Sequence, residues 1–198
     1  MSKSYAPLAS HPFKAGSNVA RPTQVLPQHV TLNDPAVNVM TDLRSVSLLC
    51  VRAKTTLDKA NEKMIRYGVR MLLVTDDADQ VCGVLTATDV LGEKPVRFLQ
   101  QMGGTHANIL VRDVMSVVRE MEASYLEDVL KAKVGNVLAR LKVAGRQHAL
   151  VVENNADGSQ TVRGLFSATQ IARQLGVQIG GGGVAEVFAE IESAVAAH

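Results

Sequence analysis

Residues 83–89, GVLTATD, return farther along the chain as residues 164–170, GLFSATQ. Each copy runs from a glycine through apolar residues to a hydroxyl side chain, Thr86 or Ser167, where a strand is expected to end and a helix to begin. Other segments recur in the same order: residues 39–41 (VMT) as 114–116 (VMS), and Gly68 with 72–74 (LLV) as Gly145 with 149–151 (ALV). Because several segments recur together, the sequence indicates one structural unit built twice.

The elements around the repeated motif follow from the spacing of apolar residues. The first copy is expected to form a strand, a helix, two strands joined as a hairpin, and a second helix, at residues 47–51, 56–67, 70–75, 81–86 and from 87 onward. The second copy repeats this order, with its longer helix at 133–144. The predicted fold class is therefore α/β (α+β), made of two β-α-β-β-α repeats. Each repeat is small for an independent core, so the two are expected to pack against each other.

The chain divides into four predicted segments. Their boundaries are 1–33 for an extended or flexible N-terminal arm, 34–104 and 105–176 for the two repeats, and 177–198 for a glycine-rich joint followed by a helix. In this last helix the apolar residues share one stripe, formed by Val184, Val187, Phe188, Ile191 and Val195. Such a stripe needs cover, so the helix is expected to dock either on its own body or on a partner subunit.

Composition excludes several classes of protein. Lysine and arginine number 21 against 19 aspartates and glutamates, a net charge of +2, and no tryptophan is present, so neither a basic nucleic-acid surface nor a base-stacking platform is expected. The longest apolar runs fall far short of the roughly 18 residues that cross a bilayer, and Pro7 and Pro12 interrupt the first residues where a secretory signal would be apolar. No membrane segment and a cytoplasmic location are predicted.

The repeat resembles the cystathionine beta-synthase (CBS) domain. The resemblance rests on Gly-Val-Arg at 68–70 before an apolar strand, the acidic turn at Asp76 and Asp77, and Gly-Val-Leu-Thr-x-x-Asp at 83–89, and it extends over roughly residues 35–176. A tandem pair of CBS domains is also called a Bateman module. The resemblance implies a pseudo-twofold pair with two clefts between the repeats, which hold AMP, ADP, ATP or S-adenosylmethionine, and it implies that two pairs assemble as a homodimer.

The resemblance also implies which residues line the first cleft. These are Thr86 and Asp89 on the sugar, Met121 and Ala123 in the first strand of the second repeat on the adenine, and Gln147 and His148 on the phosphate. A carboxylate can accept two hydrogen bonds from a ribose diol, which suits Asp89 to the sugar. Histidine ordinarily titrates near neutral pH, so phosphate affinity through His148 is predicted to change between pH 6 and pH 8.

The second cleft departs from the family pattern. Ser167 keeps the hydroxyl group, but Gln170 stands where the family has aspartate, and a neutral amide is a weaker acceptor for a diol than a carboxylate. Arg70 holds the place that matches Gln147, so a phosphate-binding cation remains without its ribose anchor. One good site per pair is expected, with the second cleft either empty or open to a different ligand.

No residue pattern points to catalysis. The histidines have no metal-ligand spacing, Cys50 and Cys82 form no CxxC pair, and no nucleophile motif is present, so the protein is not expected to be an enzyme, to hold a metal or to require a cofactor. The predicted function is that of a stand-alone CBS-pair sensor that signals ligand occupancy to an unidentified effector protein. The alternative is a ligand-independent dimerisation scaffold that binds a partner through its terminal segments. In that case Thr86 and Ser167 only cap helices, and Asp89 only complements a helix dipole.

Overall fold

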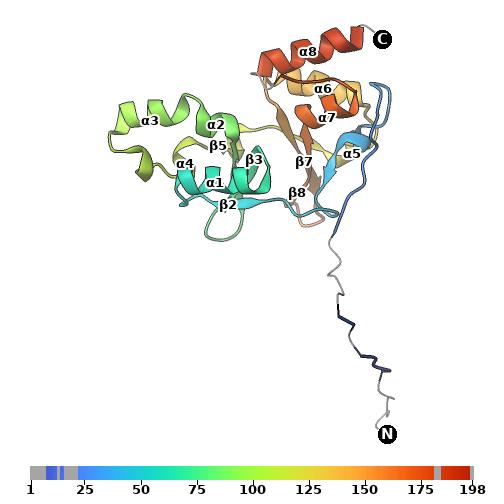
Figure 1. Cartoon of the computed structure of the whole chain (residues 1–198), viewed down its shortest axis with the longest axis horizontal. Coiled ribbons are helices and arrows are strands. Elements are labelled where there is room, and N and C mark those ends of the chain that lie inside the picture. The colour runs from blue at the N-terminus through green and yellow to red at the C-terminus, as the bar shows by residue number, and fades with distance from the viewer. Residues whose placement is uncertain (1–7, 13, 16–21, 181–183, 197–198) are drawn as a thin grey trace.

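The computed structural model describes residues 8–12, 14–15, 22–180 and 184–196. The last two ranges form two lobes side by side (Figure 1). The first lobe contains β2 (Cys50–Arg52), α1 (Leu57–Tyr67), β3 (Met71–Thr75), β4 (Val81–Thr86), α2 (Ala87–Leu91), α3 (Lys94–Met102), a 3-10 turn at His106–Asn108, α4 (Val111–Val114) and β5 (Ser116–Val117). The second lobe contains a 3-10 turn at Ala36–Val39, β1 (Thr41–Asp42), β6 (Ala123–Tyr125), α5 (Leu126–Val129), α6 (Val134–Val143), β7 (His148–Asn154), β8 (Gln160–Ser167), α7 (Ala168–Gln174) and α8 (Val184–Ala196). A third 3-10 turn, Val118–Glu120, lies in the connection between the lobes.

Each lobe is built on a four-stranded sheet, with the strand order β2-β3-β4-β5 in the first and β1-β8-β7-β6 in the second. β2 runs parallel to β3 and β6 runs parallel to β7, whereas the hairpins β3-β4 and β7-β8 are antiparallel. The hairpin registers pair Met71 with Thr86 and His148 with Ser167. Because the registers match, each repeat carries its hydroxyl residue beside the start of its central strand. The predicted fold class and the β-α-β-β-α order of each repeat are confirmed.

The helix before each central strand has the expected pattern and end. In α1 the buried residues Leu57, Ala60 and Met64 fall on one face, which packs on the sheet. Gly68 ends this helix with φ 64, a left-handed conformation that glycine adopts without steric cost. Gly145 has φ 59 at the same place after α6. The recurrence of these two glycines in the sequence therefore reflects the same helix ending in both repeats.

The leading segment of each repeat lies on the other repeat. β1 pairs with β8, and Val39 and Met40 belong to the core of the second lobe. β5 pairs with β4, and Val111 belongs to the core of the first lobe. The sequence boundaries at 34–104 and 105–176 therefore do not coincide with the packed units. The reason is that β4 and β8 each leave one edge to be paired, and the strand that fills it comes from the start of the opposite repeat.

A separate apolar cluster joins the two lobes. It contains Met71, Leu73 and Val84 from the first sheet and Leu150 from the second, with Met121 and Leu165 packed against it. These residues lie on the sheet faces opposite to those that carry the helices. The two repeats thus pack against each other, as their small size predicted.

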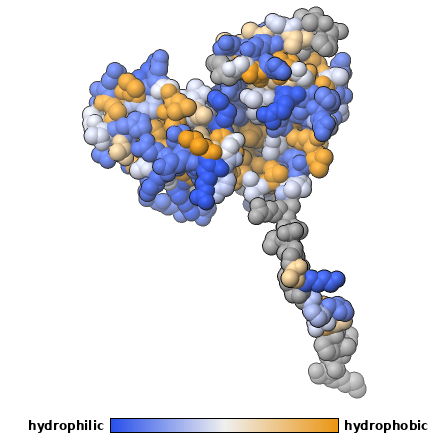
Figure 2. Space-filling model, in the orientation of Figure 1, coloured by the Kyte–Doolittle hydropathy of each residue, from blue (hydrophilic) through white to orange (hydrophobic). Residues whose placement is uncertain are grey.

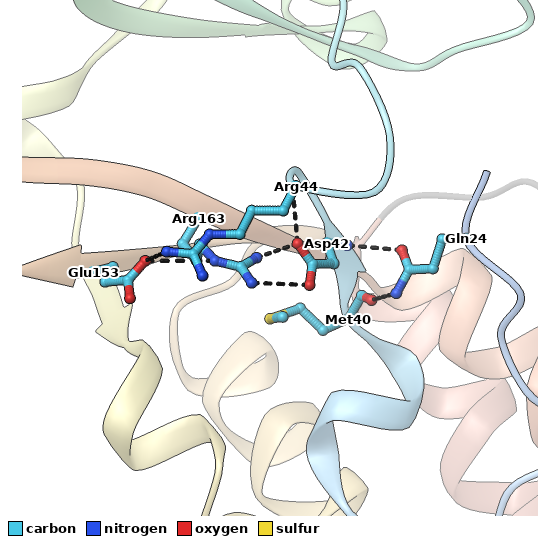
Figure 3. A network of polar contacts seen from close by, with 6 residues as sticks. All are labelled: Gln24, Met40, Asp42, Arg44, Glu153 and Arg163. Carbon is cyan, nitrogen blue, oxygen red and sulfur yellow. Dashed lines mark hydrogen bonds and ion pairs between the residues drawn. The ribbon is translucent and has the colours of Figure 1, made fainter. Parts of the chain in front are cut away.

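The described part of the N-terminal arm, residues 22–33, is bound to the second lobe. The Gln24 side chain donates a hydrogen bond to the Met40 carbonyl (2.9 Å) and accepts one from the Asp42 backbone N–H (2.8 Å), so its amide completes the free edge of β1 (Figure 3). Val30 is buried in the core of that lobe. This part of the predicted extended or flexible arm contains no helix or strand, and contacts such as the Gln24 amide on the sheet edge, which composition does not reveal, hold it against the lobe. Residues 1–7, 13 and 16–21 lie outside the described residues.

Helix α8 docks on its own chain. Val187, Phe188 and Ile191 are buried in the core of the second lobe, and Glu192 forms an ion pair with Lys142 of α6. Figure 1 shows α8 stacked over α6 and α7. Of the two predicted alternatives, these three residues therefore dock on the chain itself and not on a partner subunit. Residues 181–183 of the predicted joint and the Val195 side chain lie outside the description.

A network of charged side chains fastens β1 to β8 (Figure 3). Arg163 of β8 makes two hydrogen bonds to the Asp42 carboxylate, of which the bond from Nη2 to Oδ2 measures 3.0 Å. Glu153 lies 3.5 Å from Arg163 Nε and 2.9 Å from Arg44 Nη2. The Arg163 side chain is only 11% exposed, and its hydrogen bonds are the main reason why the pKa of Asp42 lies below its usual value.

Candidate functional site

A cavity of about 280 Å³ lies between the lobes and takes its lining from both repeats. The surface in Figure 2 is hollowed between the two lobes. The cavity brings together six of the residues predicted from the sequence: Arg70, Thr86, Asp89, Met121, Gln147 and His148. Their convergence follows from the pairing of the strands, because the segments before β3 and β7 and the end of β4 meet at the same end of the interface between the lobes.

Thr86 and Asp89 form a reciprocal cap at the start of α2. Asp89 Oδ2 accepts hydrogen bonds from the backbone N–H and the hydroxyl of Thr86, both 2.8 Å long, and the Asp89 N–H donates to the Thr86 hydroxyl at 3.2 Å. The helix-capping role that was the alternative for Thr86 in the sequence analysis is therefore present. A carboxylate has about four acceptor positions, so Asp89 keeps capacity for further donors such as ribose hydroxyls.

Lys94 does not line the cavity, but it contacts Asp89, and the sequence did not reveal this contact. Its Nζ lies 2.6 Å from Asp89 Oδ1 and donates hydrogen bonds to the Val114 carbonyl (3.1 Å) and the Ser116 hydroxyl (3.3 Å). The break between α2 and α3 turns Lys94 back toward Asp89, a geometry that helical spacing alone does not predict.

His148 lies half-buried at the start of β7. Burial is the main cause that lowers its pKa from 6.5 to about 4; the positive charge of Arg70 lowers it further, and Asp89 opposes the shift. The imidazole is therefore neutral between pH 6 and pH 8, which differs from the expectation of a titration in that range. The burial that causes the difference depends on the packing of the two lobes.

This pKa predicts how stability changes with pH. The unfolded chain binds a proton at His148 below about pH 6.5 and the folded chain does so only below about pH 4, so the free energy of unfolding falls as pH is lowered through this window. Between pH 7 and pH 5 the loss amounts to about 2 kcal/mol. Urea unfolding of His148→Gln should lack this loss, whereas His29→Gln, a change at an exposed histidine, should keep it. Equal losses in the wild-type protein and His148→Gln would contradict the prediction.

Two predicted contact residues lie in unexpected places. Ala123 does not line this cavity; it lies in a neighbouring groove of about 710 Å³ between β6, β8 and the turn before β4, a groove that shares Met121 with the cavity. Arg70, expected in the second cleft, lines the same cavity as Thr86 and Asp89. Matching the two repeats to each other by sequence does not show that the segments before both central strands line one cavity.

The residues of the predicted second cleft are engaged with each other. The Ser167 hydroxyl accepts a hydrogen bond from the Gln170 N–H at 3.5 Å, as a helix cap does. The Gln170 side chain accepts one from Thr41 (3.3 Å) and donates one to Gln174 (3.5 Å). Ser167 does not line the cavity described above. Its place at the head of α7 mirrors that of Thr86 at the head of α2.

Among the further residues that line the cavity are Arg146, Ser116 and Val184, none of which was predicted as a ligand contact. Arg146 stands directly before Gln147, so extending the predicted contact segment 147–148 by one residue would have included it. Val184 is the first residue of α8 and comes from outside the repeats. Only the docking of α8 on the second lobe brings it there.

Among the described residues, no group of three or more histidine, cysteine, aspartate or glutamate side chains could hold a metal ion. None of the helices within the described ranges is long and apolar enough to cross a membrane.

Comparison with known proteins identifies the fold. Residues 37–95 match the family described as CBS domain. Three solved structures are similar over most of the chain: an uncharacterized conserved protein from Pyrococcus horikoshii (20% identity, 77% of this chain and 100% of that one, TM-score 0.54), CBSX2 of Arabidopsis thaliana in complex with AMP (21%, 71% and 94%, 0.51), and a CBS domain protein of unknown function from Thermoplasma acidophilum (18%, 78% and 76%, 0.51). No curated protein matches the sequence. The family match thus covers residues 37–95, within the first repeat, and the two repeats together share the fold of these solved structures, which include a CBS domain protein.

Proposed function

We propose that this protein is a regulatory CBS-pair module that binds an adenine nucleotide in the cavity between its lobes and passes the occupancy to a partner protein. The observation that carries the proposal is the cavity itself, which combines the Thr86–Asp89 motif of one repeat with Gln147 and His148 of the other. CBSX2, a solved structure with the same fold, is in complex with AMP, which makes an adenine nucleotide the first ligand to test.

The residues have distinct roles in this proposal. Asp89 accepts hydrogen bonds from the ribose, Met121 packs against the base, and Gln147 with the neutral His148 donates hydrogen bonds to the phosphate. A ligand held by both lobes stabilises one relative packing of the two sheets. That shift in packing is the signal available to an effector.

A homodimer is part of the proposal. Ile65 of α1 and Leu91 of α2 are 73% and 75% exposed on the helical layer of the first lobe. Large exposed apolar side chains of this kind are more common where another protein binds than on a free surface. A second copy of the chain covering this layer would remove them from water, and sedimentation equilibrium of the wild-type protein against Ile65→Glu tests that assembly.

Calorimetric titration tests ligand binding directly. The wild-type protein is expected to bind AMP, ADP or ATP at about one molecule per chain. Asp89→Asn removes a negative oxygen acceptor while its amide oxygen can still accept from the Thr86 N–H, so the cap persists and the ribose contact weakens. The affinity is expected to fall about tenfold, which is about 1.4 kcal/mol.

The control is Ser167→Ala, which lies at the matching position of the other repeat and outside the cavity. It should leave the affinity unchanged. The absence of heat for every adenine ligand, with the assembly intact, would reject the sensor and favour the ligand-independent scaffold, in which the Thr86–Asp89–Lys94 contacts serve only the start of α2.

A further inference from the structure

The carboxylate of Asp89 is largely occupied by groups of its own chain. A carboxylate offers about four acceptor positions, two on each oxygen. The two on Oδ2 are taken by the backbone N–H and the hydroxyl of Thr86. Near Oδ1, Lys94 Nζ lies 2.6 Å away and takes a third. The two hydroxyls of a ribose bring two donors, so Asp89 accepts both of them only when Lys94 withdraws.

The two partners of this ion pair differ in their access to water. The Lys94 side chain is 45% exposed, whereas the Asp89 side chain is 10% exposed. An ammonium group that leaves the pair is hydrated at once, while the carboxylate stays in the wall of the cavity, held by Thr86. A buried carboxylate oxygen that loses a donor needs another one. The pair is therefore built for an exchange in which ligand hydroxyls replace Lys94.

Lys94 also connects the cavity wall to a helix outside it. It is the first residue of α3, and its Nζ donates hydrogen bonds to the Val114 carbonyl (3.1 Å) and the Ser116 hydroxyl (3.3 Å). Ser116 lines the cavity and belongs to β5, the leading strand of the second repeat. One ammonium group thus fastens the start of α3 to Asp89 and to β5. Figure 1 shows α3 at the outer end of the first lobe, away from the second.

We infer that Lys94 is an inhibitory latch: its ammonium group occupies Asp89 until a ligand with a ribose diol displaces it, and the displacement releases the start of α3. The inference rests on the proposed function and adds the step by which occupancy of the cavity reaches the surface of the protein. A ligand that binds fully only after the latch has opened has a lower apparent affinity, in proportion to the open fraction. Removal of the latch therefore raises the affinity, which is the opposite of what removal of a ligand contact does.

The test is calorimetric titration of the wild-type chain and Lys94→Met with adenosine, with a dideoxyadenosine that lacks both ribose hydroxyls, and with AMP. Adenosine has the diol and no charge, so loss of the ammonium charge does not change its attraction to the cavity. Methionine keeps an unbranched side chain that favours helix. Adenosine is expected to bind Lys94→Met about tenfold more tightly than the wild-type chain, and dideoxyadenosine is expected to bind both equally.

Lys63→Met is the matched control. Lys63 Nζ also donates to a backbone carbonyl, that of Cys50 (2.6 Å), but it lies outside the cavity, so this variant should bind both nucleosides as the wild-type chain does. Lys94→Gln, whose amide can still donate to the Val114 carbonyl, should show the same gain for adenosine and replaces Lys94→Met if that variant does not fold. Hydrogen exchange gives a second readout: adenosine should speed exchange in α3 of the wild-type chain, and α3 of Lys94→Met should exchange fast without it.

The outcomes separate the latch from the proposed function. Adenosine binding that is equal or weaker in Lys94→Met, or a gain that dideoxyadenosine shows as well, would overturn the latch and leave the adenine site. Adenosine binding by Lys94→Met alone would support the latch, because Lys94 would then block Asp89 in the wild-type chain. No binding of adenosine or AMP to either protein would reject both.

Discussion

Gly83→Val is expected to lower the free energy of unfolding by about 3 kcal/mol, because β5 crosses the place where a side chain would stand. A Cβ atom at Gly83 would lie 2.6 Å from Met115 Sδ and 2.9 Å from the Ser116 carbonyl oxygen. The second of these atoms belongs to the backbone of β5, which is hydrogen-bonded to β4 and cannot move alone. Urea unfolding measures the loss, and Gly135→Ala in α6 is the control, since its Cβ would meet nothing closer than 3.4 Å and alanine favours helix.

The matching glycine of the other repeat sharpens the test. A Cβ atom at Gly164 would meet Met40 Sδ at 2.7 Å and the Thr41 carbonyl at 3.2 Å, so here the flexible side chain causes most of the clash. Combining Gly164→Ala with Met40→Ala should therefore show a larger favourable coupling than combining Gly83→Ala with Met115→Ala. Equal coupling in the two cycles, or a Gly83→Val protein as stable as the wild type, would contradict this account of the glycine in each motif.

Asp42→Val is expected to cost about 3 kcal/mol of unfolding free energy, since it leaves the Arg163 charge largely buried without its main partner. Glu153 stays within 3.5 Å of Arg163 and limits the loss. The low pKa of Asp42 gives the same interaction a pH dependence. Its contribution is complete above the unfolded pKa of about 3.8 and disappears as pH falls through the folded value, so the wild type and Asp42→Val should approach each other in stability in strong acid.

The first repeat provides the control for this pair. Cys82 and Val117 occupy the places that Arg163 and Asp42 occupy in the second repeat, as the pairing of Gly83 with Val117 and of Gly164 with Asp42 shows. The double variant Asp42→Val/Arg163→Cys introduces the residue types of the first repeat at these two positions and removes both charges. It should be less destabilising than Asp42→Val alone. If the double variant unfolds as easily as the sum of its single changes predicts, the uncompensated charge is not the cause.

Local patterns in the sequence determined the elements of this protein. The apolar spacing of α1, the glycines at 68 and 145, and the two copies of the 83–89 motif each act over a few neighbouring residues, so they can be recognised without knowing the fold. The repetition predicted a packed pair of units, because two small units with one apolar face each have to share a core. The CBS fold itself was implied by the resemblance of the motifs to that family. Most of the contact residues that the resemblance implied line one cavity.

Contacts between residues far apart in the chain decided the rest. The exchange of β1 and β5 between the repeats, the Gln24 amide on the edge of β1 and the ion pair of Lys94 with Asp89 depend on how strands and helices meet. The burial that keeps His148 neutral has the same origin. Hydrogen bonds and charges act over a few ångströms in space whatever their distance along the chain, so composition and spacing carry no record of them. The sequence by itself therefore determined the repeated unit, and only the tertiary structure decided which of its charged side chains are paired with each other.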